Sequence, residues 1–362
     1  MHVVYDGWIF RWQRAGGINR YFQEVVQRLP QDWAVTFIGL VRGNSLPVAH
    51  AGLARRYNTE LRPRRWSQRL QALWWNRTLL KSDALFHPTY YFLNGGLRWQ
   101  DVKQPVVLTV HDFIHASYPG QLDNHEETLR AQREAIERAD HLICVSEATR
   151  SQLLERFPGL SKPVSVIHHG ASFGRSRPNA DAGPDAPPLF LFVGARHGYK
   201  NFSFLVRAFA RALQTLPQLR LHVVGAPLTP EEQRFIASAG LAGQVQSSVF
   251  PSEDELQALY RRSTALLYPS LHEGFGIPPL EAMICGTIPV TGNSTSLPEV
   301  MGDCGIMLDA TNADQWTECI LSLARGLPHR EALRQKGLAR AAQFTWENSA
   351  ARHVEVYRSL LA

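Results

Sequence analysis

Short apolar runs alternate with longer amphipathic stretches along nearly the whole chain. Several of these runs are continuously apolar, which is typical of strands in a parallel sheet, because helices cover both faces of such a sheet. The alternation therefore favours a doubly wound α/β fold. In the first half it predicts strands at His2–Tyr5, Val35–Leu40, Ala84–His87, Val106–His111, His141–Ser146 and Val164–His168. It predicts helices between them at Ile18–Leu29, His125–Ala139 and Glu147–Phe157.

The alternation is interrupted by a stretch rich in Pro, Gly, Asp and Asn. Residues 172–188 read S-F-G-R-S-R-P-N-A-D-A-G-P-D-A-P-P, a composition typical of a linker. We therefore expect a Rossmann-like domain over residues 1–172, a linker over 173–188 and a second Rossmann-like domain over 189–344. Two such domains leave a cleft between them, a favoured place for a ligand. In the second domain we expect strands at Leu189–Val193, Arg220–Val224, Val245–Val249, Ala265–Tyr268 and Ile288–Val290.

Composition limits the classes of protein to which this chain can belong. Its 362 residues, 44% of them hydrophobic and 19% charged, are typical of a globular protein with room for two cores. The sequence has no apolar run near the roughly 20 residues that span a bilayer. Met1 leads directly into a strand without a basic and apolar leader, so we do not expect export. Reduced cytosolic thiols are expected, because metal-ligand spacing is lacking among Cys144, Cys285, Cys304 and Cys319.

The net charge of +6 has one conspicuous source, the segment of residues 55–81. Tryptophan and leucine recur at helical spacing within it, and this combination favours an interfacial helix on an anionic membrane. A basic surface helix whose tryptophans join the core, or a nucleic-acid site, would be the alternatives. We predict a membrane surface as partner and no nucleic acid. The basic residues are Arg55, Arg56, Arg62, Arg64, Arg65, Arg69, Arg77 and Lys81, and the apolar ones are Trp66, Leu70, Leu73, Trp74 and Trp75.

Residues 264–300 combine a strand, a glycine-bearing loop and the start of a helix. The apolar T-A-L-L-Y-P leads into H-E-G-F-G, and P-P-L-E-A-M-I-C then predicts a helix at Pro278–Cys285, ended by Gly286. A helix N-terminus suits an anion or a ring of hydroxyl groups. Glu273 lies at the mouth of this site and Glu281 about one turn into the helix, so both are candidate acceptors for sugar hydroxyls. The alternative is an ordinary βα unit with Glu281 on its surface.

The sequence H-E-G-F-G-I-P-P-L-E-A-M, with the later N-S-T-S-L-P-E-V, resembles the donor-binding signature of the retaining glycosyltransferases of family 4. This resemblance implies the two-domain GT-B fold, with an amphipathic helix over residues 345–362 crossing back onto the first domain. Thr345 is suited to cap that helix. The resemblance also implies no metal and no other cofactor, and the sequence contains no D-x-D. The donor-binding residues that it implies are Glu273, Gly274, Phe275, Gly276, Ile277 and Glu281.

Two further segments are candidates for gripping a donor diphosphate. Gly16 and Gly17, in A-G-G-I-N-R-Y, open a helix where the backbone can approach phosphate, although a tight turn with positive φ is the alternative. Arg196 and Lys200 follow a strand in G-A-R-H-G-Y-K and would supply a planar fork and a point charge. Both segments resemble the phosphate-binding segments of family 4. Tyr199 is a departure, because relatives often carry another basic residue there.

Polar residues at two other strand ends complete the candidate site. His111 and Asp112 close a predicted strand, at the carboxyl end where such sheets bind ligands. The resemblance places His111 near the donor sugar and Asp112 nearby, where we expect it to contact the acceptor. Ser146 and Glu147 begin S-E-A-T-R, which also fits the family. Glu147 would either cap a helix, the reading that we favour, or face the acceptor.

Together these residues predict a retaining hexosyltransferase that uses a nucleotide diphosphate sugar and the hydroxyl of a glycan or lipid-linked glycan. Its catalytic residues would be Glu273, His111, Arg196 and Lys200. G-G-I-N-R-Y, V-H-D and V-S-E-A-T-R resemble bacterial mannosyl- and rhamnosyltransferases of surface polysaccharide synthesis, so GDP-mannose is favoured over UDP-glucose or a UDP-N-acetylhexosamine. We expect the protein in the cytoplasm, at the inner face of the plasma membrane. The alternatives are a GT-B-fold sugar-nucleotide epimerase or phosphorylase, and a non-catalytic glycan-binding protein.

Overall fold

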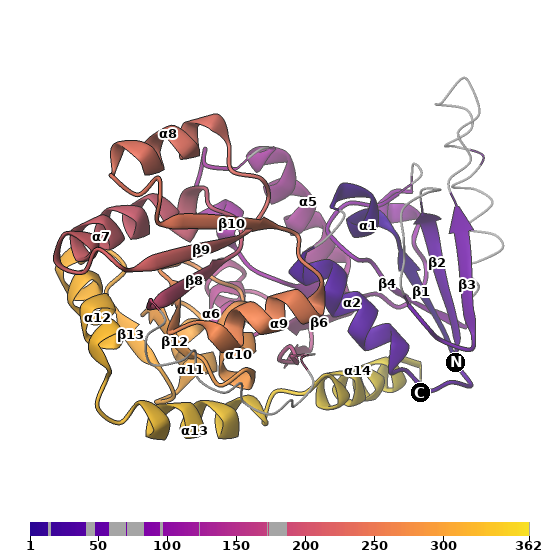
Figure 1. Cartoon of the computed structure of the whole chain (residues 1–362). Coiled ribbons are helices and arrows are strands. Elements are labelled where there is room, and N and C mark those ends of the chain that lie inside the picture. The colour runs from indigo at the N-terminus through magenta and orange to yellow at the C-terminus, as the bar shows by residue number, and fades with distance from the viewer. Residues whose placement is uncertain are drawn as a thin grey trace. The chain divides into compact units, whose positions relative to one another are not determined.

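The chain forms two compact units in the computed structural model (Figure 1). The first unit comprises Met1–Gly170 and Trp346–Ala362, and the second comprises Ala171–Thr345. Most of the predicted linker lies outside the described residues. The structure describes residues 1–13, 16–40, 48–57, 70, 83–94, 97–122, 124–171, 173 and 187–361.

The first unit is built on parallel strands. A four-stranded sheet has the order β3-β2-β1-β4, and a three-stranded sheet has the order β5-β6-β7. A parallel bridge between Phe86 and Val106 connects the two sheets. The strands are β1 (His2–Asp6), β2 (Ala34–Leu40), β3 (Leu53–Tyr57), β4 (Ala84–His87), β5 (Val107–Val110), β6 (His141–Cys144) and β7 (Val164–Val166). The helices are α1 (Trp8–Trp12), α2 (Gly17–Gln27), α4 (Ile114–Ser117), α5 (His125–Arg138), α6 (Glu147–Arg156) and α14 (Trp346–Leu361).

The strand order of the first unit reverses beside β1. The chain builds outward from β1 through β2 to β3, and β4 then pairs with the other side of β1. The carboxyl ends of two strands that flank such a reversal leave a crevice, because their connections leave in opposite directions. In this unit the two connections begin with α1, after β1, and with residues 88–94, after β4.

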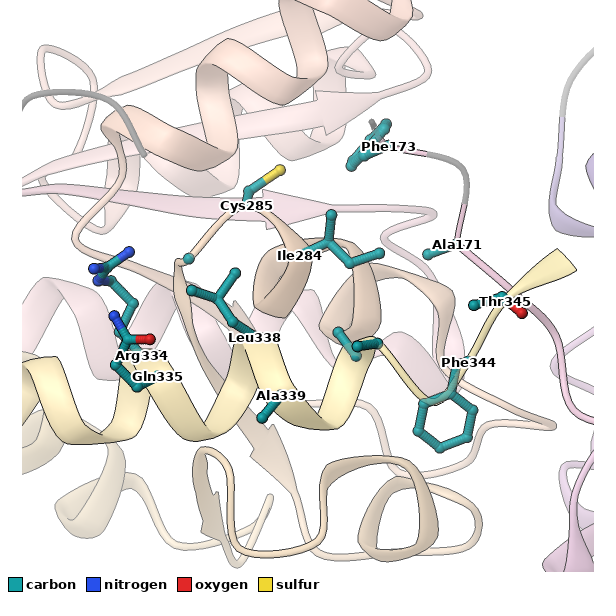
Figure 2. A pocket seen from close by; sticks show the side chains of 13 residues that line it. Ala171, Phe173, Ile284, Cys285, Arg334, Gln335, Leu338, Ala339, Phe344 and Thr345 are labelled. Carbon is teal, nitrogen blue, oxygen red and sulfur yellow. The ribbon is translucent and has the colours of Figure 1, made fainter. Parts of the chain in front are cut away.

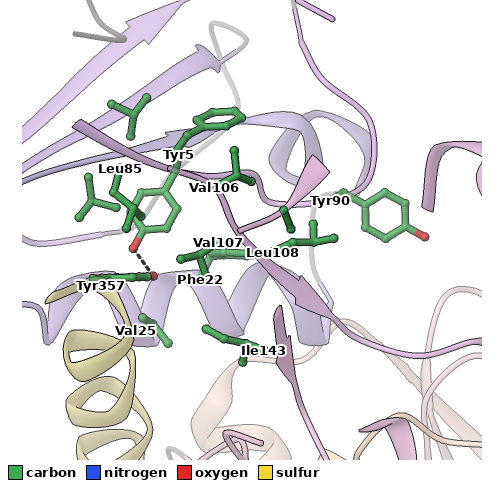
Figure 3. Close-up of a cluster of buried hydrophobic side chains, with 14 of the residues drawn as sticks. Tyr5, Phe22, Val25, Leu85, Tyr90, Val106, Val107, Leu108, Ile143 and Tyr357 are labelled. Atoms are coloured by element: carbon green, nitrogen blue, oxygen red, sulfur yellow. Dashed lines mark hydrogen bonds between the residues drawn. The ribbon is translucent and has the colours of Figure 1, made fainter. Parts of the chain in front are cut away.

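The C-terminal helix α14 belongs to the first unit, where it packs against α2 and β4. Its anchor is a buried polar network inside an apolar core: the hydroxyls of Tyr357 and Tyr5 lie 3.0 Å apart (Figure 3), and His87 Nδ1 lies 2.7 Å from the Tyr357 hydroxyl. Tyr21, on α2, contacts His353 Nε2 of α14 at 2.5 Å. The predicted return of this helix to the first domain is therefore confirmed. The helix begins at Trp346, which leaves Thr345 at the predicted cap position.

The second unit repeats the plan of the first with a single sheet of order β10-β9-β8-β11-β12-β13. All its strand pairs are parallel, and the order reverses between β8 and β11. Its strands are β8 (Leu189–Val193), β9 (Arg220–Gly225), β10 (Val245–Val249), β11 (Ala265–Tyr268), β12 (Ile288–Gly292) and β13 (Ile306–Leu308). Its helices are α7 (Phe202–Thr215), α8 (Pro230–Ser238), α9 (Glu253–Arg262), α10 (Ile277–Ile284), α11 (Leu297–Met301), α12 (Ala313–Arg325) and α13 (Arg330–Ala341).

The predicted α/β alternation is confirmed, with small differences at the ends of elements and two strands that were missed. The strand expected at Val106–His111 ends at Val110, so His111 lies in the following loop. Strand β13 is only three residues long, and β3 reads L-A-R-R-Y with its last three residues exposed, so neither presents a long apolar run. Because β3 contains Arg55 and Arg56, the start of the basic segment is a strand.

Candidate functional site

Two predicted site residues meet in the second unit, beside the reversal of its strand order. Lys200 follows β8, and Glu273 follows β11. Lys200 Nζ lies 2.7 Å from Glu273 Oε1 and 3.0 Å from Oε2. Only 14% of the lysine side chain and 9% of the glutamate side chain are exposed, so solvent screens this pair weakly. The adjacent carboxyl ends of β8 and β11 explain why residues 73 positions apart meet.

Tyrosine rings surround the lysine of this pair. The ammonium group donates to the Tyr268 hydroxyl at 3.1 Å, and it lies 5.3 Å from the centre of that ring and 5.2 Å from the centre of the Tyr199 ring. Burial, together with the Glu273 carboxylate, holds the pKa of Tyr268 well above its ordinary value, so the phenol keeps its proton. Tyr199, the departure from the expected family pattern, therefore contributes a π face to Lys200.

The loop that carries Glu273 is held by residues between β12 and α11. The Glu273 amide donates to Thr295 Oγ1 at 2.9 Å, and Ser296 Oγ donates to the carbonyl oxygens of Glu273 and Phe275 at 3.0 and 2.9 Å. Thr295 adopts φ +51°, a strained conformation for a β-branched residue. Both residues belong to the N-S-T-S-L-P-E-V segment, whose sequence indicates no role for them. They fix the backbone from which Glu273 projects.

The N-terminus of α10 lies directly after this loop. Its capping residue, Gly276, has φ +100°, a conformation that favours glycine, and no side chain caps the helix there. Pro278 and Pro279 occupy the first turn, where the lack of an N–H costs least. Gly286 follows the helix with φ +73°, as predicted for the residue that ends it. Glu273, Gly274, Phe275, Gly276 and Ile277 thus lead into a helix N-terminus suited to an anion or a hydroxyl-rich ligand.

Glu281 lies inside the second unit. It is 4% exposed, and the Tyr260 hydroxyl donates to its Oε2 at 2.9 Å. Burial and the adjacent carboxylate raise the pKa of Tyr260 well above its ordinary value, so Tyr260 remains a donor. The alternative of Glu281 as a surface residue is therefore wrong. Tyr260 was missed because nothing in the sequence of α9 indicates that it points at α10.

Arg196 is bound by a carboxylate that sequence reasoning did not find. Its Nε and Nη2 donate to Glu232 Oε1 and Oε2 at 2.8 and 2.9 Å, and Nη1 and Nη2 donate to the carbonyls of Ala226 and Pro227 at 2.9 and 2.8 Å. Burial raises the pKa of Glu232, but hydrogen bonds from Arg196 and Thr229 outweigh it and hold the pKa below its ordinary value. Glu232 belongs to the helix-capping sequence T-P-E-E, and it does form that cap. The capping sequence alone gives no sign that Glu232 also binds Arg196.

In the first unit, Gly16 and Gly17 form the N-terminus of α2. Gly16 is the capping residue, with φ 169° and ψ 168°, and Gly17 is the first helical residue. This backbone is extended at Gly16, so the alternative of a tight turn with positive φ is wrong. Both glycines are exposed, and no side chain caps this end of the helix.

His111 lies at the carboxyl end of β5 in an aromatic environment. It is 6% exposed, and Tyr21 packs edge-on against it at 5.4 Å between ring centres. Burial lowers the pKa of His111 to about 3, so the ring is neutral at pH 7. Its buried Nε2 atom has no hydrogen-bond partner among the described residues. A buried nitrogen of this kind costs free energy unless a ligand or water meets it.

The two predicted acceptor residues have different local roles. Asp112 Oδ1 accepts from the backbone N–H of Ile114 at 3.0 Å, at the start of α4. Ser146, not Glu147, is the N-cap of α6, because its side chain accepts from Thr149 N at 3.0 Å. The preference for Glu147 as a cap is therefore wrong. Glu147 is exposed and lies 3.3 Å from Arg150, one turn along the same helix.

An apolar hollow of about 510 Å³ lies elsewhere in the second unit, between the end of α10 and helix α13 (Figure 2). Ile284 and Cys285 form one side, Leu338 and Ala339 another, and Phe344 lies at one end. None of the predicted donor-binding residues lines it. This hollow is therefore separate from the Lys200–Glu273 pair.

The described part of the chain contains neither a metal cluster nor a membrane-spanning helix. Within it, no group of three or more His, Cys, Asp or Glu side chains is placed to hold a metal ion. None of the helices described there combines the length and apolar character that crossing a membrane requires. Of the basic segment, only residues 55–57 and 70 are described, so its predicted helix lies outside the described residues.

Solved structures with the same fold cover the whole chain. Sucrose-phosphate synthase from Thermosynechococcus elongatus matches with a TM-score of 0.78 and 19% identity over 99% of both chains. Anabaena HepE, solved with UDP and glucose, matches with a TM-score of 0.75 and 17% identity over 99% of this chain and 100% of its own. With two Rossmann-like units and a returning C-terminal helix, the chain has the GT-B glycosyltransferase fold.

Family models and relatives identify the family. The model described as Glycosyltransferase Family 4 matches residues 15–175, and the model described as Glycosyl transferases group 1 matches residues 177–340. The chain therefore belongs to the family 4 glycosyltransferases.

Curated relatives include two Escherichia coli mannosyltransferases. O-antigen chain mannosyltransferase B is 29% identical over 302 residues, which cover 77% of this chain and 75% of that protein. The serotype-specific mannosyltransferase WbdA is 29% identical over 72% of this chain, but the match spans only 34% of WbdA. A D-inositol 3-phosphate glycosyltransferase of Streptosporangium roseum is 26% identical over 78% of this chain and 73% of that protein.

Proposed function

We propose that this glycosyltransferase moves a hexose, with mannose from GDP-mannose favoured, to a hydroxyl of a glycan or lipid-linked glycan in bacterial surface polysaccharide synthesis. The proposed transfer retains the anomeric configuration and uses no metal ion. One observation carries the proposal: the weakly screened Lys200–Glu273 pair beside the N-terminus of α10. It supplies a cation for phosphate oxygens and a carboxylate for sugar hydroxyls at one strand reversal.

Lys200 and the N-terminus of α10 would stabilise the diphosphate as it leaves. Charge builds up on the diphosphate oxygens in the transition state, so groups fixed in advance lower the barrier without reorganising. Losing one such donor typically costs about 3 kcal/mol. Arg196 would contribute to the same charge stabilisation, with Glu232 holding its guanidinium in place. Gly16 and Gly17 would offer backbone N–H groups from the uncapped start of α2.

Glu273 and Glu281 would bind opposite ends of the donor. Glu273 would accept hydrogen bonds from the sugar hydroxyls, and Glu281, held by Tyr260, would accept from the ribose. His111 would meet the transferred sugar as a neutral ring, because burial lowers its pKa to about 3. Asp112 and Glu147 are the proposed acceptor contacts. The attacking hydroxyl would pass its proton to the departing diphosphate, so no protein nucleophile is required.

The identity of the sugar rests on relatives. Two of the matched proteins carry mannosyltransferase in their names, and one of these acts on an O-antigen chain. The solved complex of HepE contains UDP and glucose, which makes UDP-glucose the leading alternative donor.

Thermal unfolding in the presence of a panel of nucleotides and nucleotide sugars tests the donor. A ligand that binds only the folded state adds about 2.7 kcal/mol of stability at 100 times its dissociation constant. We expect the largest stabilisation from GDP and GDP-mannose, measured without metal and again with EDTA. If only UDP compounds stabilise the protein, a UDP-sugar replaces GDP-mannose as the proposed donor. If the stabilisation disappears with EDTA, the proposed metal independence is wrong.

Product analysis separates transfer from the rival activities. Incubation of the best donor with a mannose-containing acceptor should yield an α-linked product by NMR, since the donor sugar is α-linked. An altered sugar nucleotide formed without acceptor would indicate an epimerase. If no donor in the panel is consumed although one binds, the protein is a binding protein.

The basic segment of residues 55–81 is proposed to place the enzyme on the inner face of the bacterial plasma membrane, in contact with lipid-linked acceptors. Each basic residue near an anionic surface contributes about 1 kcal/mol. A variant with Arg62, Arg64, Arg65 and Arg69 changed to Ser should lose binding to phosphatidylglycerol vesicles in a sedimentation assay. Unchanged binding would eliminate this part of the proposal.

A further inference from the structure

Helix α1 and the loop after β4 place aromatic side chains side by side in the first unit. The rings of Trp12 and Tyr90 lie 5.4 Å apart between centres with an interplanar angle of 33°, and those of Trp8 and Phe92 lie 5.2 Å apart at the same angle. Tyr90 also lies 6.1 Å from Phe92, nearly parallel to it. We call Trp8, Trp12, Tyr90 and Phe92 the aromatic shelf.

A buried hydrogen-bond network fixes the two segments that form the shelf. Asp6 Oδ1, at the end of β1, accepts from the N–H and hydroxyl of Thr89 at 3.0 and 2.9 Å and from the N–H of Trp8 at 3.3 Å. The Thr89 hydroxyl oxygen in turn accepts from the N–H of Ile9 at 3.1 Å. The start of α1 is thereby tied to the loop that carries Tyr90, so the shelf is preorganised.

The outer ring of the shelf faces solvent. Trp12 is 60% exposed, whereas Tyr90 beneath it is 7% exposed. Figure 3 includes Tyr90 among the buried hydrophobic side chains of this unit. Single exposed hydrophobic residues are common, but an exposed indole that packs at a tilt on a second, fixed ring is a ready surface for a flat apolar ligand.

The shelf lies at the carboxyl ends of β1 and β4, beside the strand reversal of the first unit. A predicted acceptor residue is close to it: burial first, and then the charge of Asp112, raise the pKa of Tyr90. Asp112 follows β5, the first strand of the neighbouring three-stranded sheet, and the exposed indole follows β1 of the four-stranded sheet.

We propose that Trp12, backed by Tyr90, is a stacking subsite for a pyranose ring of the acceptor glycan. This inference rests on the proposed function and names where its acceptor would bind. A pyranose has one face of C–H groups, which the negative π face of an indole attracts, and an edge of hydroxyls that a carboxylate such as Asp112 can bind. The Asp112 carboxylate suits sugar hydroxyls better than an anionic lipid surface.

Saturation-transfer NMR with α-(1→3)-linked mannobiose tests the subsite without requiring catalysis. We expect signal transfer to the C–H protons of one sugar face in the wild type, its loss in Trp12→Ala, and its retention in Trp12→Phe. In transfer assays, the acceptor KM of Trp12→Ala should rise about tenfold or more, as for a central aromatic contact. Leu154→Ala is the matched control, because Leu154 is an exposed hydrophobic residue of the same unit, 39% exposed.

Failure of this inference is distinguishable from failure of the proposed function. Mannobiose that does not bind the wild type, or that binds Trp12→Ala equally well, overturns the subsite. If Trp12→Ala still binds mannobiose but no longer binds phosphatidylglycerol vesicles, the shelf is a lipid contact and the proposal is wrong. The donor is judged separately, by whether a nucleotide stabilises the wild type against thermal unfolding.

Discussion

The two units of this enzyme share one plan of parallel strands with a reversal of order, yet their buried polar groups differ in kind. In the second unit, Lys200 pairs with Glu273, and Arg196 pairs with Glu232. In the first, neutral rings form the buried network: Tyr5, Tyr21, His87, His353 and Tyr357, with Thr109 between His87 and Tyr21. The second unit thus holds two ion pairs with little-exposed cations, whereas hydrogen-bonded rings form the largest buried polar network of the first unit, which also buries Asp6.

This difference indicates a division of labour. Fixed charges in a weakly solvated site interact strongly with a charged ligand, so the second unit suits a diphosphate. The ring network of the first unit connects α14 to α2, β1, β4 and β5, and it gives the returning helix hydrogen-bond partners instead of unpaired buried groups.

The largest effect is expected from Glu273→Gln, which removes the negative charge of the pair and keeps the shape of the side chain. Lys200 would lose its carboxylate partner, and the sugar would lose its proposed acceptor. We expect kcat to fall about 100- to 1,000-fold, as for the loss of one preorganised catalytic group. Transfer assays with the donor identified by the nucleotide panel measure this. Glu318→Ala, an exposed glutamate of the same unit, is the control. Near-normal kcat in Glu273→Gln would show that the pair is only structural.

The next effect is a difference between the two units in how their stability depends on pH. Burial lowers the pKa values of His87, His111, His169 and His353, all in the first unit. Between pH 6.5 and about 4, the unfolded state therefore binds more protons than the folded state. Stability must fall as pH falls through this window, by about 1.4 kcal/mol per pH unit for each such histidine. Asp6, whose pKa burial raises to about 6, acts in the opposite direction and offsets one of them.

Hydrogen exchange, corrected for intrinsic rates and resolved by peptide, measures this pH dependence. In the second unit, burial lowers the pKa of His222, and Glu232 loses its stabilising effect only as pH falls below its unfolded pKa of about 4.5. Protection in the first unit should therefore decline at higher pH than protection in the second. Equal decline in both units would contradict the contrast between rings and ion pairs.

A smaller effect is expected from Tyr357→Phe in α14. The missing hydroxyl would remove the partner of His87 Nδ1 and of the Tyr5 hydroxyl in a buried site, at a cost of about 1 to 3 kcal/mol. Denaturant unfolding measures this loss of stability, and hydrogen exchange shows whether it is felt in α14. Tyr57→Phe, at a tyrosine that is 40% exposed, should change stability by less than about 0.5 kcal/mol. A loss no larger than this control would show that the ring network does not anchor the helix.

The smallest effect is expected from Tyr260→Phe, which removes the hydroxyl that holds Glu281. If Glu281 binds the ribose, the affinity for GDP should fall about fivefold, equivalent to about 1 kcal/mol. The affinity for pyrophosphate should not change, because it has no ribose. Calorimetric titration with both ligands distinguishes this positioning role from general destabilisation, which would weaken both.

Local sequence determined the α/β plan, the helix start after Gly276 and the positions of the motifs at strand ends, because periodicity, glycine and proline act within a few residues. Position around the loop and helix start also indicated Glu273 and Glu281, and family resemblance favoured a donor-binding role for them over the alternative. Neither indicated β3, because an exposed edge strand lacks the continuous apolar run of a buried one.

Only the tertiary structure decided which polar groups meet. Lys200 and Glu273 are 73 positions apart, Arg196 and Glu232 are 36 apart, and Tyr21 and His353 are 332 apart. The stacking of Trp12 on Tyr90 likewise depends on β1 lying beside β4. Strand order sets these distances, and strand order follows from the packing of the whole sheet rather than from any short segment.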